Sequence, residues 1–584
     1  MESKPIEYLK RVLESTIRVV SGVILFLLSL LFFYLWITKD SVPVVKQNSR
    51  TDSKVLVDSG LSEMLTNVIT QAAVAEAQEK ANLEARRETL VSLQSSSEMM
   101  RLLKLAENGD VESQSQFLVM FFKMDKSRGR ELTADWARKF AEKGNPIAQA
   151  MMGDFCGGNG DDRGGMGSNF ALAADWYRKS AEQGNAYAQR VLGQMYLHSK
   201  GVTKDVSQAL KWSRLAADQG DSLAQYDVGV IYYDVSGVQR DIVEAMKWIH
   251  KSANQGNVAA QNMLGLIYLG GSGIPADSAE ANRWFRMTAG KGDSLGQFCL
   301  GESYLFGRGV SKNLPEALGL IRKAADQGYD RAEVRLGLLY EFGDGVPQDF
   351  SKAVEMYRRA IDHGSIKAQV YLGERYFQGE GVGKDLTAAA NWYRSAASHG
   401  DADGQAKLGW CYYNGTGVSK DLAEAAKWHR KAAEQGAADG QCGLAECYYY
   451  GAGVAKDFTE AAKWYRKAAE QGSVFAQTKL GYLYHVGEGV PKDFSEALKW
   501  HRKAADQGGD TALSNLAECF RDGTGVPRNE IEAYALFNLA GATLEEARKE
   551  RDKLEKGFSP ESRLRAQQRS LEIQSAIDAK KAGK

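Results

Sequence analysis

"KDFTEAAKWYRKAAEQG", residues 456–472, is the stretch that decides the fold. A nearly identical segment, KDLAEAAKWHRKAAEQG, occupies residues 420–436, and KDFSEALKWHRKAADQG occupies residues 492–508. Each copy begins 36 residues after the previous one. None of the three contains a recognisable catalytic arrangement, so the fixed spacing indicates a structural repeat.

The same register extends through most of the chain. A glycine followed by Val, Ile or Met recurs every 36 residues, at Gly165, Gly201, Gly237, Gly273, Gly309, Gly345, Gly381, Gly417, Gly453, Gly489 and Gly525. The eighth residue after each of these glycines is always alanine. The eleventh is Trp176, Trp212, Trp248, Trp284, Trp392, Trp428, Trp464 or Trp500, with Leu or Met in the other copies. An unbroken register predicts that every copy adopts the same structure.

The first half of each copy is predicted to be an amphipathic helix, called helix A below. The alanine, the tryptophan and a later pair of alanines follow the spacing i, i+3, i+7, i+8, which places them on one helix face. Asp421 with Glu424 predicts an N-cap and a capping box at the start of one such helix. Gly436 predicts its end, because glycine adopts the left-handed conformation of a helix stop at little cost.

The second half is predicted to be another helix, helix B. Asp221, Asp401 or Ser473 can cap it, and it carries a leucine followed by a small residue, as in Leu192 and Gly193. The small residue predicts close approach of a helix A. A tyrosine then follows, at Tyr196, Tyr232, Tyr268, Tyr304, Tyr340, Tyr376, Tyr412, Tyr448 and Tyr484.

A single pair of such helices leaves one apolar stripe uncovered, and an identical pair stacked on it covers that stripe. The sequence therefore predicts an all-α fold, a right-handed α/α superhelical solenoid of about twelve helix hairpins over residues 99–542. Residues 543–584 have fewer apolar positions and are predicted to form charged capping helices and a tail, as expected at the open end of a solenoid.

The pattern Ala-x-x-Trp-Tyr/His-Arg-Lys-Ala-Ala-Glu-Gln-Gly, followed by Leu-Gly-x-x-Tyr-x-x-Gly-x-Gly-Val, resembles the Sel-one-like repeat (SLR) family, relatives of tetratricopeptide repeats. The resemblance covers residues 99–542. It implies a superhelix that scaffolds protein complexes, and it favours a bacterial envelope protein. Cysteine-rich bacterial members pair cysteines within each repeat, and this chain lacks that pattern. Adaptors of the quality-control branch are tethered near the C-terminus, unlike the arrangement predicted next.

Residues 19–37, VVSGVILFLLSLLFFYLWI, form an uncharged run that spans about 28 Å as a helix. We predict a transmembrane helix that follows a short cytoplasmic tail, residues 1–18; a cleaved signal peptide is the alternative. Four basic residues precede the run and three follow it within a similar distance. This excess predicts a cytoplasmic N-terminus, and hence a periplasmic or other extracytoplasmic solenoid, with a cytoplasmic solenoid as the alternative.

Between this run and the repeats, residues 38–60 are polar and read as a linker, and residues 61–98 as a helical stalk. Leu61, Leu65, Val68, Ala72 and Ala75 alternate spacings of four and three, which is typical of a coiled coil. Residues 61–97 could therefore join two copies of the chain. A single helix packed on the first repeat explains the pattern equally well.

The chemistry-bearing residue types form no site that we recognise. Lys+Arg 74 balances Asp+Glu 74, which argues against a nucleic-acid partner. The six cysteines lack metal or disulfide spacing and are predicted to be buried free thiols, and the seven histidines form no metal motif. GGNGDDRGGMG, residues 157–167, lacks the lysine of a phosphate loop and reads as an enlarged inter-helix loop. We expect no enzyme activity, no cofactor and no metal.

Two surface columns are candidates for partner binding. Arginine recurs on helix A, for example at Arg394, Arg430 and Arg466, and an aligned column could bind acidic peptides. The favoured interpretation is that these arginines pair with the acids found four residues later in most copies. The residue after the helix B tyrosine varies, which suggests exposure. The candidate contacts there are Tyr233, Tyr413, Tyr449 and Tyr450, although half-buried packing is the simpler account of each.

Taken together, these features predict a membrane-tethered, non-enzymatic scaffold whose solenoid presents an extended concave surface to a protein or peptide partner. Two other functions remain open. One is an oligomeric spacer of an envelope complex, joined through residues 61–97. The other is recognition of envelope polysaccharide by exposed aromatic residues.

Overall fold

The computed structural model describes residues 97–124, 130–158 and 169–582, and in these residues it contains the 27 α-helices α3 to α29 and no strand. The predicted cytoplasmic tail, transmembrane helix and linker, and all of the predicted stalk except residues 97 and 98, lie outside the described residues. The predicted loop over residues 157–167 also lies outside them, apart from its first two glycines. Among the helices that the structure describes, none has the length and apolar character needed to span a membrane.

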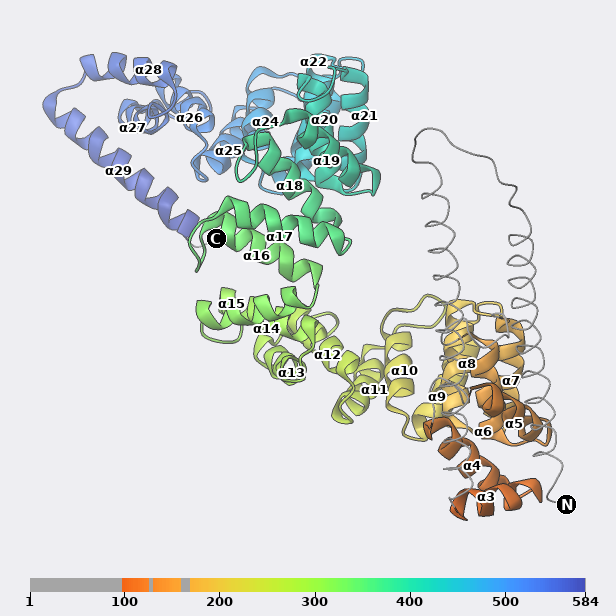
Figure 1. Ribbon diagram of the computed structural model, residues 1–584. Coiled ribbons are helices and arrows are strands. Elements are labelled where there is room, and N and C mark those ends of the chain that lie inside the picture. The colour runs from red at the N-terminus through yellow and green to blue at the C-terminus, as the bar shows by residue number, and fades with distance from the viewer. Residues whose placement is uncertain (1–96, 125–129, 159–168, 583–584) are drawn as a thin grey trace, which may run out of the picture. The chain divides into compact units, whose positions relative to one another are not determined.

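The helices follow one another as pairs (Figure 1). The chain divides into two compact units, Met1–Phe117 and Leu118–Lys584. The twelve pairs are α3 (Ser97–Glu107) and α4 (Val111–Met124), α5 (Arg130–Glu142) and α6 (Pro146–Cys156), α7 (Phe170–Glu182) and α8 (Ala186–His198), α9 (Val206–Asp218) and α10 (Ser222–Asp234), α11 (Ile242–Asn254) and α12 (Val258–Gly270), α13 (Ser278–Gly290) and α14 (Ser294–Phe306), α15 (Leu314–Asp326) and α16 (Asp330–Phe342), α17 (Phe350–Asp362) and α18 (Ile366–Gln378), α19 (Leu386–Ser398) and α20 (Ala402–Asn414), α21 (Leu422–Glu434) and α22 (Ala438–Tyr450), α23 (Phe458–Glu470) and α24 (Val474–Val486), and α25 (Phe494–Ala505) and α26 (Asp510–Asp522). The predicted all-α repeat fold is confirmed.

The helix ends lie where the sequence predicts them. Asp421 Oδ1 accepts hydrogen bonds from the backbone N–H groups of Ala423 and Glu424, at 3.0 Å each, and so caps α21. Gly436 follows α21 with φ +90°, the left-handed conformation that glycine adopts most readily. Asp401 and Ser473 cap α20 and α24. Local hydrogen bonds and a glycine stop therefore mark the ends of these helices.

Packing between neighbours depends on a position that the sequence analysis did not assign to the core. The residue after the helix A tryptophan is buried and lies against the small residue of the preceding helix B. Tyr357 is fully buried, and a Cβ on Gly337 would come within 2.5 Å of its Cε1. Four of the tryptophans, including Trp428 and Trp464, are only half-buried. Lys467 Nζ lies 3.9 Å from the ring centroid of Trp464, a cation–π contact.

A ladder of glutamines joins consecutive hairpins. Gln477, in α24, is buried; its Nε2 donates to Ala469 O at 3.0 Å and its Oε1 accepts from Gln507 Nε2 at 3.0 Å. The same glutamine pairs recur at Gln183–Gln149, Gln219–Gln189, Gln255–Gln225, Gln327–Gln297, Gln435–Gln405 and Gln471–Gln441. The Gln-Gly motif therefore both ends helix A and links it to the hairpin before, because the buried amide needs a partner.

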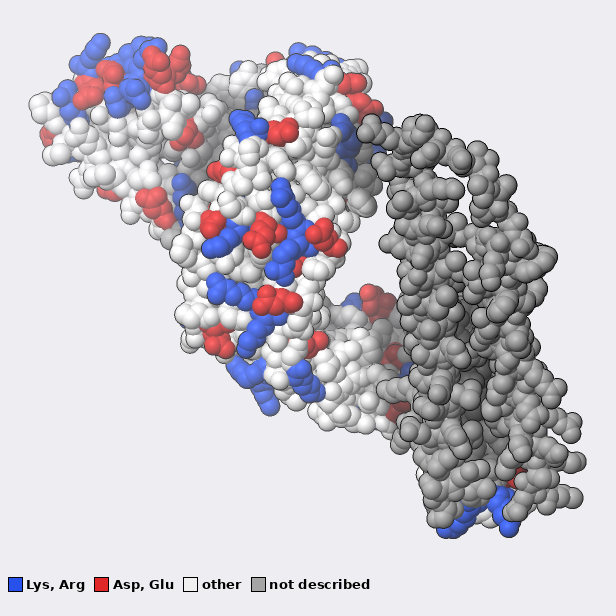
Figure 2. All heavy atoms as spheres, in the orientation of Figure 1, with Lys and Arg blue, Asp and Glu red and all other residues white. Residues whose placement is uncertain are grey.

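The C-terminal end of the array is covered by charged helices, as predicted. α27 (Glu530–Ala540) is a last helix A, followed by α28 (Glu545–Lys556) and α29 (Pro560–Ala582). α29 packs on α27 and buries Ala566 and Ile577. Lys580 near its end pairs with Asp506 at 2.8 Å. Figure 2 shows acidic and basic side chains close together over α28.

Candidate partner-binding groove

A groove of about 500 Å³ lies along the helix B surfaces of α18, α20, α22 and α24. We call it the α20–α22 groove. It is lined by Glu374, Phe377, Tyr393, Ala406, Lys407, Trp410, Tyr413, Asn414, His429, Asp439, Cys442, Gly443, Glu446, Ser473 and Phe475. Trp410 and Phe475 are 43% and 44% exposed, so large aromatic surface faces solvent here. Trp410 also packs edge-on against Phe377, with ring centroids 5.5 Å apart.

Two residues that line the groove are smaller than their counterparts in the neighbouring copies of the repeat. Gly443 stands where the copies on either side have Lys407 and Lys479. His429 stands where they have Tyr393 and Tyr465, and it is buried between Gly409 and Gly443. The His429 ring packs directly against Gly443, where a Cβ would lie within 2.4 Å of it, and both residues line the groove.

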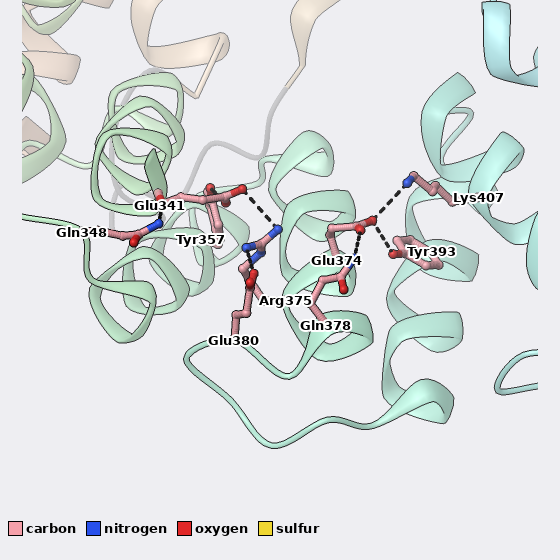
Figure 3. Close-up of polar contacts among 9 residues, drawn as sticks. All are labelled: Glu341, Gln348, Tyr357, Glu374, Arg375, Gln378, Glu380, Tyr393 and Lys407. Atoms are coloured by element: carbon pink, nitrogen blue, oxygen red, sulfur yellow. Dashed lines mark hydrogen bonds and ion pairs between the residues drawn. The ribbon is translucent and has the colours of Figure 1, made fainter. Parts of the chain in front are cut away.

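One wall of the groove is a closed polar network (Figure 3). The Glu374 carboxylate accepts from Lys407 Nζ, from the Tyr393 hydroxyl and from Gln378 Nε2, each at 3.0 Å. Burial alone would raise the pKa of Glu374, but these hydrogen bonds and the Lys407 charge outweigh it and lower the pKa. The positive charge of Lys407 is therefore already engaged within the protein.

A second network centres on Arg375, the residue after Glu374 in α18, and joins it to α16 and α17 (Figure 3). Arg375 is buried and forms ion pairs with Glu341, at 3.1 Å, and with Glu380. The Tyr357 hydroxyl donates to Glu341 at 2.7 Å. Because every charge in this network has a partner, we assign it a structural role.

The opposite wall is open. Glu446, in α22, has no hydrogen bond or ion pair among the residues that the structure describes, and burial raises the pKa of its carboxyl. Tyr465 is fully buried, and its hydroxyl has no partner within the described ranges. His429 is 5% exposed, its Nδ1 also lacks a partner there, and burial lowers its pKa to about 4. Unsatisfied polar groups of this kind are uncommon in folded proteins and call for an explanation.

A smaller hollow of about 330 Å³ continues along α22, α24 and α26. Tyr449, Tyr465 and Tyr482 line it, together with Lys479 and Asn515. Tyr482 is 43% exposed. The helix B surface is therefore hollowed over several consecutive repeats, with aromatic walls in both hollows.

The tyrosines predicted as partner contacts have different surroundings. Tyr413 lines the α20–α22 groove and Tyr449 lines the smaller hollow, and both are half-buried. Tyr450 is 53% exposed and packs edge-on against Tyr449. Tyr233 is half-buried under Arg240, far from either hollow in the repeat order. The exposure suggested for this column is wrong for Leu305, which is buried because α15 packs against it.

The predicted arginine column lies elsewhere and has an unexpected partner. Arg430 donates to the Tyr448 hydroxyl at 3.0 Å, and Arg466 donates to that of Tyr484, each in the helix B of the same hairpin. Among the described residues, the predicted pairs with acids four residues later are not formed. Arg394 is exposed and bonds to the neighbouring Asn391 at 2.6 Å. The prediction was wrong because it considered helix A alone, without the tyrosine of helix B.

The residues that line the groove were not all predicted from the sequence, although a signal for them was present. The second residue after the helix B leucine alternates between acidic and aromatic in consecutive copies: Glu374, Trp410, Glu446, Tyr482 and Glu518. The buried helix A position alternates with it for four copies: Tyr393, His429, Tyr465 and His501. A 72-residue period is therefore superimposed on the 36-residue repeat, and a residue-by-residue comparison of alternate copies would have revealed it.

The cysteines match their prediction. All six are free; five are buried and Cys442 is half-buried at the groove. Burial raises the pKa of Cys442 to about 11, which leaves its thiol protonated and poorly reactive at neutral pH. No group of acids, histidines and cysteines in the described ranges is arranged to hold a metal ion.

The repeat pattern matches the Sel1 repeat in eleven consecutive segments between residues 146 and 542. These segments cover more than half of the chain. The chain belongs to the Sel1 repeat family. Repeat solenoids of this kind are typical scaffolds for protein–protein interaction, so the Sel1 chain described here has the architecture of an interaction scaffold.

One solved structure supports the assignment, and a second is similar in sequence. A protective antigen of uropathogenic Escherichia coli with an SLR fold is 33% identical, and the match covers 77% of this chain and 97% of that one, with a TM-score of 0.54. A Sel1 repeat protein from Oxalobacter formigenes is 35% identical over 53% of this chain and 90% of that one, with a TM-score of 0.40. A comparison with curated proteins finds no match.

Proposed function

We propose that this Sel1 chain is a membrane-tethered, non-enzymatic scaffold of a bacterial envelope that binds an extended segment of a protein partner along its helix B surface. The observation that carries the proposal is the α20–α22 groove, which combines exposed aromatic walls with unpartnered polar groups. A peptide supplies apolar side chains that can pack on the aromatic walls and hydrogen-bonding groups that can pair with the polar atoms. The arginine column is not part of the proposal, because Arg430 and Arg466 are engaged by tyrosines.

Site-specific photocrosslinking in cells tests the binding surface. A photoactivatable amino acid in place of Trp410 should crosslink to a defined protein, whereas the same change at Leu266 should not. Leu266 is the matched control, because it occupies the same position in an earlier copy of the repeat and is 45% exposed. Crosslinking of equal strength from both positions would count against the groove as the binding surface.

Membrane attachment and sidedness are part of the same proposal. The support comes from the apolar run at residues 19–37 and from its flanking charges. The Escherichia coli relative is described as a protective antigen, which agrees with a solenoid outside the cytoplasm. Fusions of alkaline phosphatase and of a fluorescent protein at residue 50 test the sidedness. We expect phosphatase activity there, and a fluorescent signal without phosphatase activity would place the solenoid in the cytoplasm.

Self-association through residues 61–97 remains a separate proposal, supported by their heptad-like spacing. Analytical ultracentrifugation of the full chain in detergent tests it. Replacing Leu65 and Val68 by glutamate should convert a dimer into a monomer if these residues form the contact. A wild-type chain that sediments as a monomer would remove the spacer function. Polysaccharide binding by exposed aromatic residues is tested with a sugar oligomer alongside the peptide-binding experiment described below.

A further inference from the structure

The floor of the α20–α22 groove contains a polar atom with no partner. His429 Nδ1 is buried and has no hydrogen-bond partner among the residues that the structure describes, and a Cβ on Gly443 would come within 2.4 Å of both Nδ1 and Cε1. The imidazole therefore packs directly against Gly443, and the two residues line the groove side by side. Because its pKa is about 4, the imidazole is neutral at physiological pH and does not repel a cation.

The charges around this floor are unbalanced. The lining contains three carboxylates, those of Glu374, Asp439 and Glu446, and one ammonium, that of Lys407. Lys407 is paired with Glu374, which leaves Asp439 and Glu446 without an ion pair in the described part of the chain. Both lie on α22, seven residues apart, and so on the same helix face.

The nearby Lys479 does not neutralise Glu446. Its Nζ lies over the ring of Phe475, 5.3 Å from the centroid, and forms no ion pair with Glu446 in the described residues. Its charge lowers the pKa of Glu446, but burial has the larger effect and the pKa stays raised. A desolvated carboxylate of this kind gains free energy when a cation comes within hydrogen-bonding distance. Lys479 lines the smaller hollow, and its contact with Phe475 shows that an aromatic ring of the groove accepts a cation.

We propose that the α20–α22 groove binds a lysine or arginine side chain of the partner, with its charged end between Glu446 and His429 Nδ1 above Gly443 and its aliphatic stem against Trp410 and Phe475. The inference rests on the proposed function, because it specifies which residue of a bound peptide enters the groove. Charge complementarity selects this occupant: an acidic side chain would meet two uncompensated carboxylates, and a purely apolar one would leave Glu446 and His429 unsatisfied.

Fluorescence anisotropy with the full-length chain in detergent tests the proposal. The probes are labelled peptides with one background of Leu, Ser and Gly that differ at a single central position, which is Lys, Arg, Glu or norleucine. We expect the Lys and Arg peptides to bind about tenfold more tightly than the norleucine peptide, and the Glu peptide to bind weakest. Glu446→Gln should remove this preference, whereas Glu434→Gln should retain it. Glu434 is an exposed acid of α21 outside the groove, so it controls for net charge.

Two further variants change the lining of the groove and test whether the peptides bind there. His429→Tyr should fill the floor and weaken all four peptides, and it should fold, because Tyr393 and Tyr465 occupy the same position in neighbouring copies. Trp410→Ala should also weaken all four, whereas Leu266→Ala should have no effect. Circular dichroism and thermal unfolding identify any variant that is misfolded. A preference for Lys and Arg that survives Glu446→Gln would overturn the inference.

The remaining outcomes separate the inference from the proposed function. If all four peptides bind equally and Trp410→Ala weakens them all, the peptide-binding function is supported and the inferred preference for a basic side chain is contradicted. If none of the peptides binds, both the peptide-binding function and the inferred preference are contradicted. Binding of a glucosamine oligomer in that case would favour polysaccharide recognition instead. Tight binding of the Glu peptide would overturn the inference alone.

Discussion

Two sites 72 residues apart carry the same three polar residues and use them differently. At the first, Glu374, Tyr393 and Lys407 bond to one another. At the second, Glu446, Tyr465 and Lys479 occupy equivalent positions, but no hydrogen bond or ion pair joins them in the described part of the chain. Gln378 completes the first site, and the second has Tyr450 at that position.

The difference appears in the carboxyl groups. The pKa of Glu374 is lowered because its hydrogen bonds and the Lys407 charge outweigh burial, whereas that of Glu446 is raised because burial dominates. The comparison teaches that a partly buried acid in a repeat array stabilises the fold where neighbouring side chains provide hydrogen bonds and an opposite charge. Where neighbours do not provide them, the carboxylate remains available to a ligand. The predictions below test this distinction.

The largest expected effect concerns the two buried histidines of helix A, His429 and His501. Burial lowers the pKa of each from 6.5 to about 4. As pH falls below 6.5 the unfolded chain binds these protons first, so each histidine should cost up to about 3 kcal/mol of stability between pH 6.5 and pH 4, and no more below pH 4. Urea unfolding at a series of pH values measures this.

The double variant H429Y/H501Y is the control for the pH experiment. Its stability should fall less than that of the wild type over the same window, because tyrosine does not titrate there. His485 lies near His501 and contributes to its low pKa, so it is left unchanged. Parallel pH curves for variant and wild type would show that these histidines are not buried as described.

The next effect concerns α21, the helix that carries His429. Ala425 is fully buried, so Ala425→Leu should overpack the contact between helices and lower the free energy of unfolding by about 1–3 kcal/mol. Ala423→Leu, at an exposed position two residues earlier, should change it little. Equal effects in a urea titration would contradict the assigned helix face.

The direct comparison of the two sites has a smaller expected difference. Glu374→Ala leaves Lys407 and Tyr393 without their partner and should lower the free energy of unfolding by about 1–2 kcal/mol. Glu446→Ala removes an unpartnered carboxylate and should change it by less than about 0.5 kcal/mol. If the two variants were equally destabilised, Glu446 would be a structural residue, and the binding site proposed around it would lose its basis.

The smallest effect separates two members of the arginine column. Arg430→Ala loses the hydrogen bond to Tyr448, whereas Arg394→Ala loses only a bond to Asn391 on its own helix. We expect Arg430→Ala to lower the free energy of unfolding by about 0.5 kcal/mol more than Arg394→Ala, because it breaks a contact between two helices. The difference is small because these arginines are exposed to solvent. Thermal unfolding of the two variants side by side measures the difference.

Much of the fold was predictable because its signals are local. The cap at Asp421 and the stop at Gly436 depend on hydrogen bonds and backbone conformation within a few residues. The 36-residue period predicts stacked hairpins even when the contacts between them are unknown. The core position of Tyr357 was missed because its partner, Gly337, lies in the preceding helix and the helix A stripe alone favours the tryptophan. The glutamine ladder was missed for a similar reason, since the Gln-Gly motif was interpreted only as a helix end.

The sequence by itself determined that this chain is a stack of similar helical pairs, since each pair contains its own start, stop and apolar faces. Only the tertiary structure decided which polar residues are satisfied and which are left open. Glu374 and Glu446 have equivalent positions in the repeat, and their difference arises from side chains that neighbouring hairpins bring alongside them. The free energy of a buried charge depends on all the atoms that surround it, and the repeat pattern does not contain that arrangement.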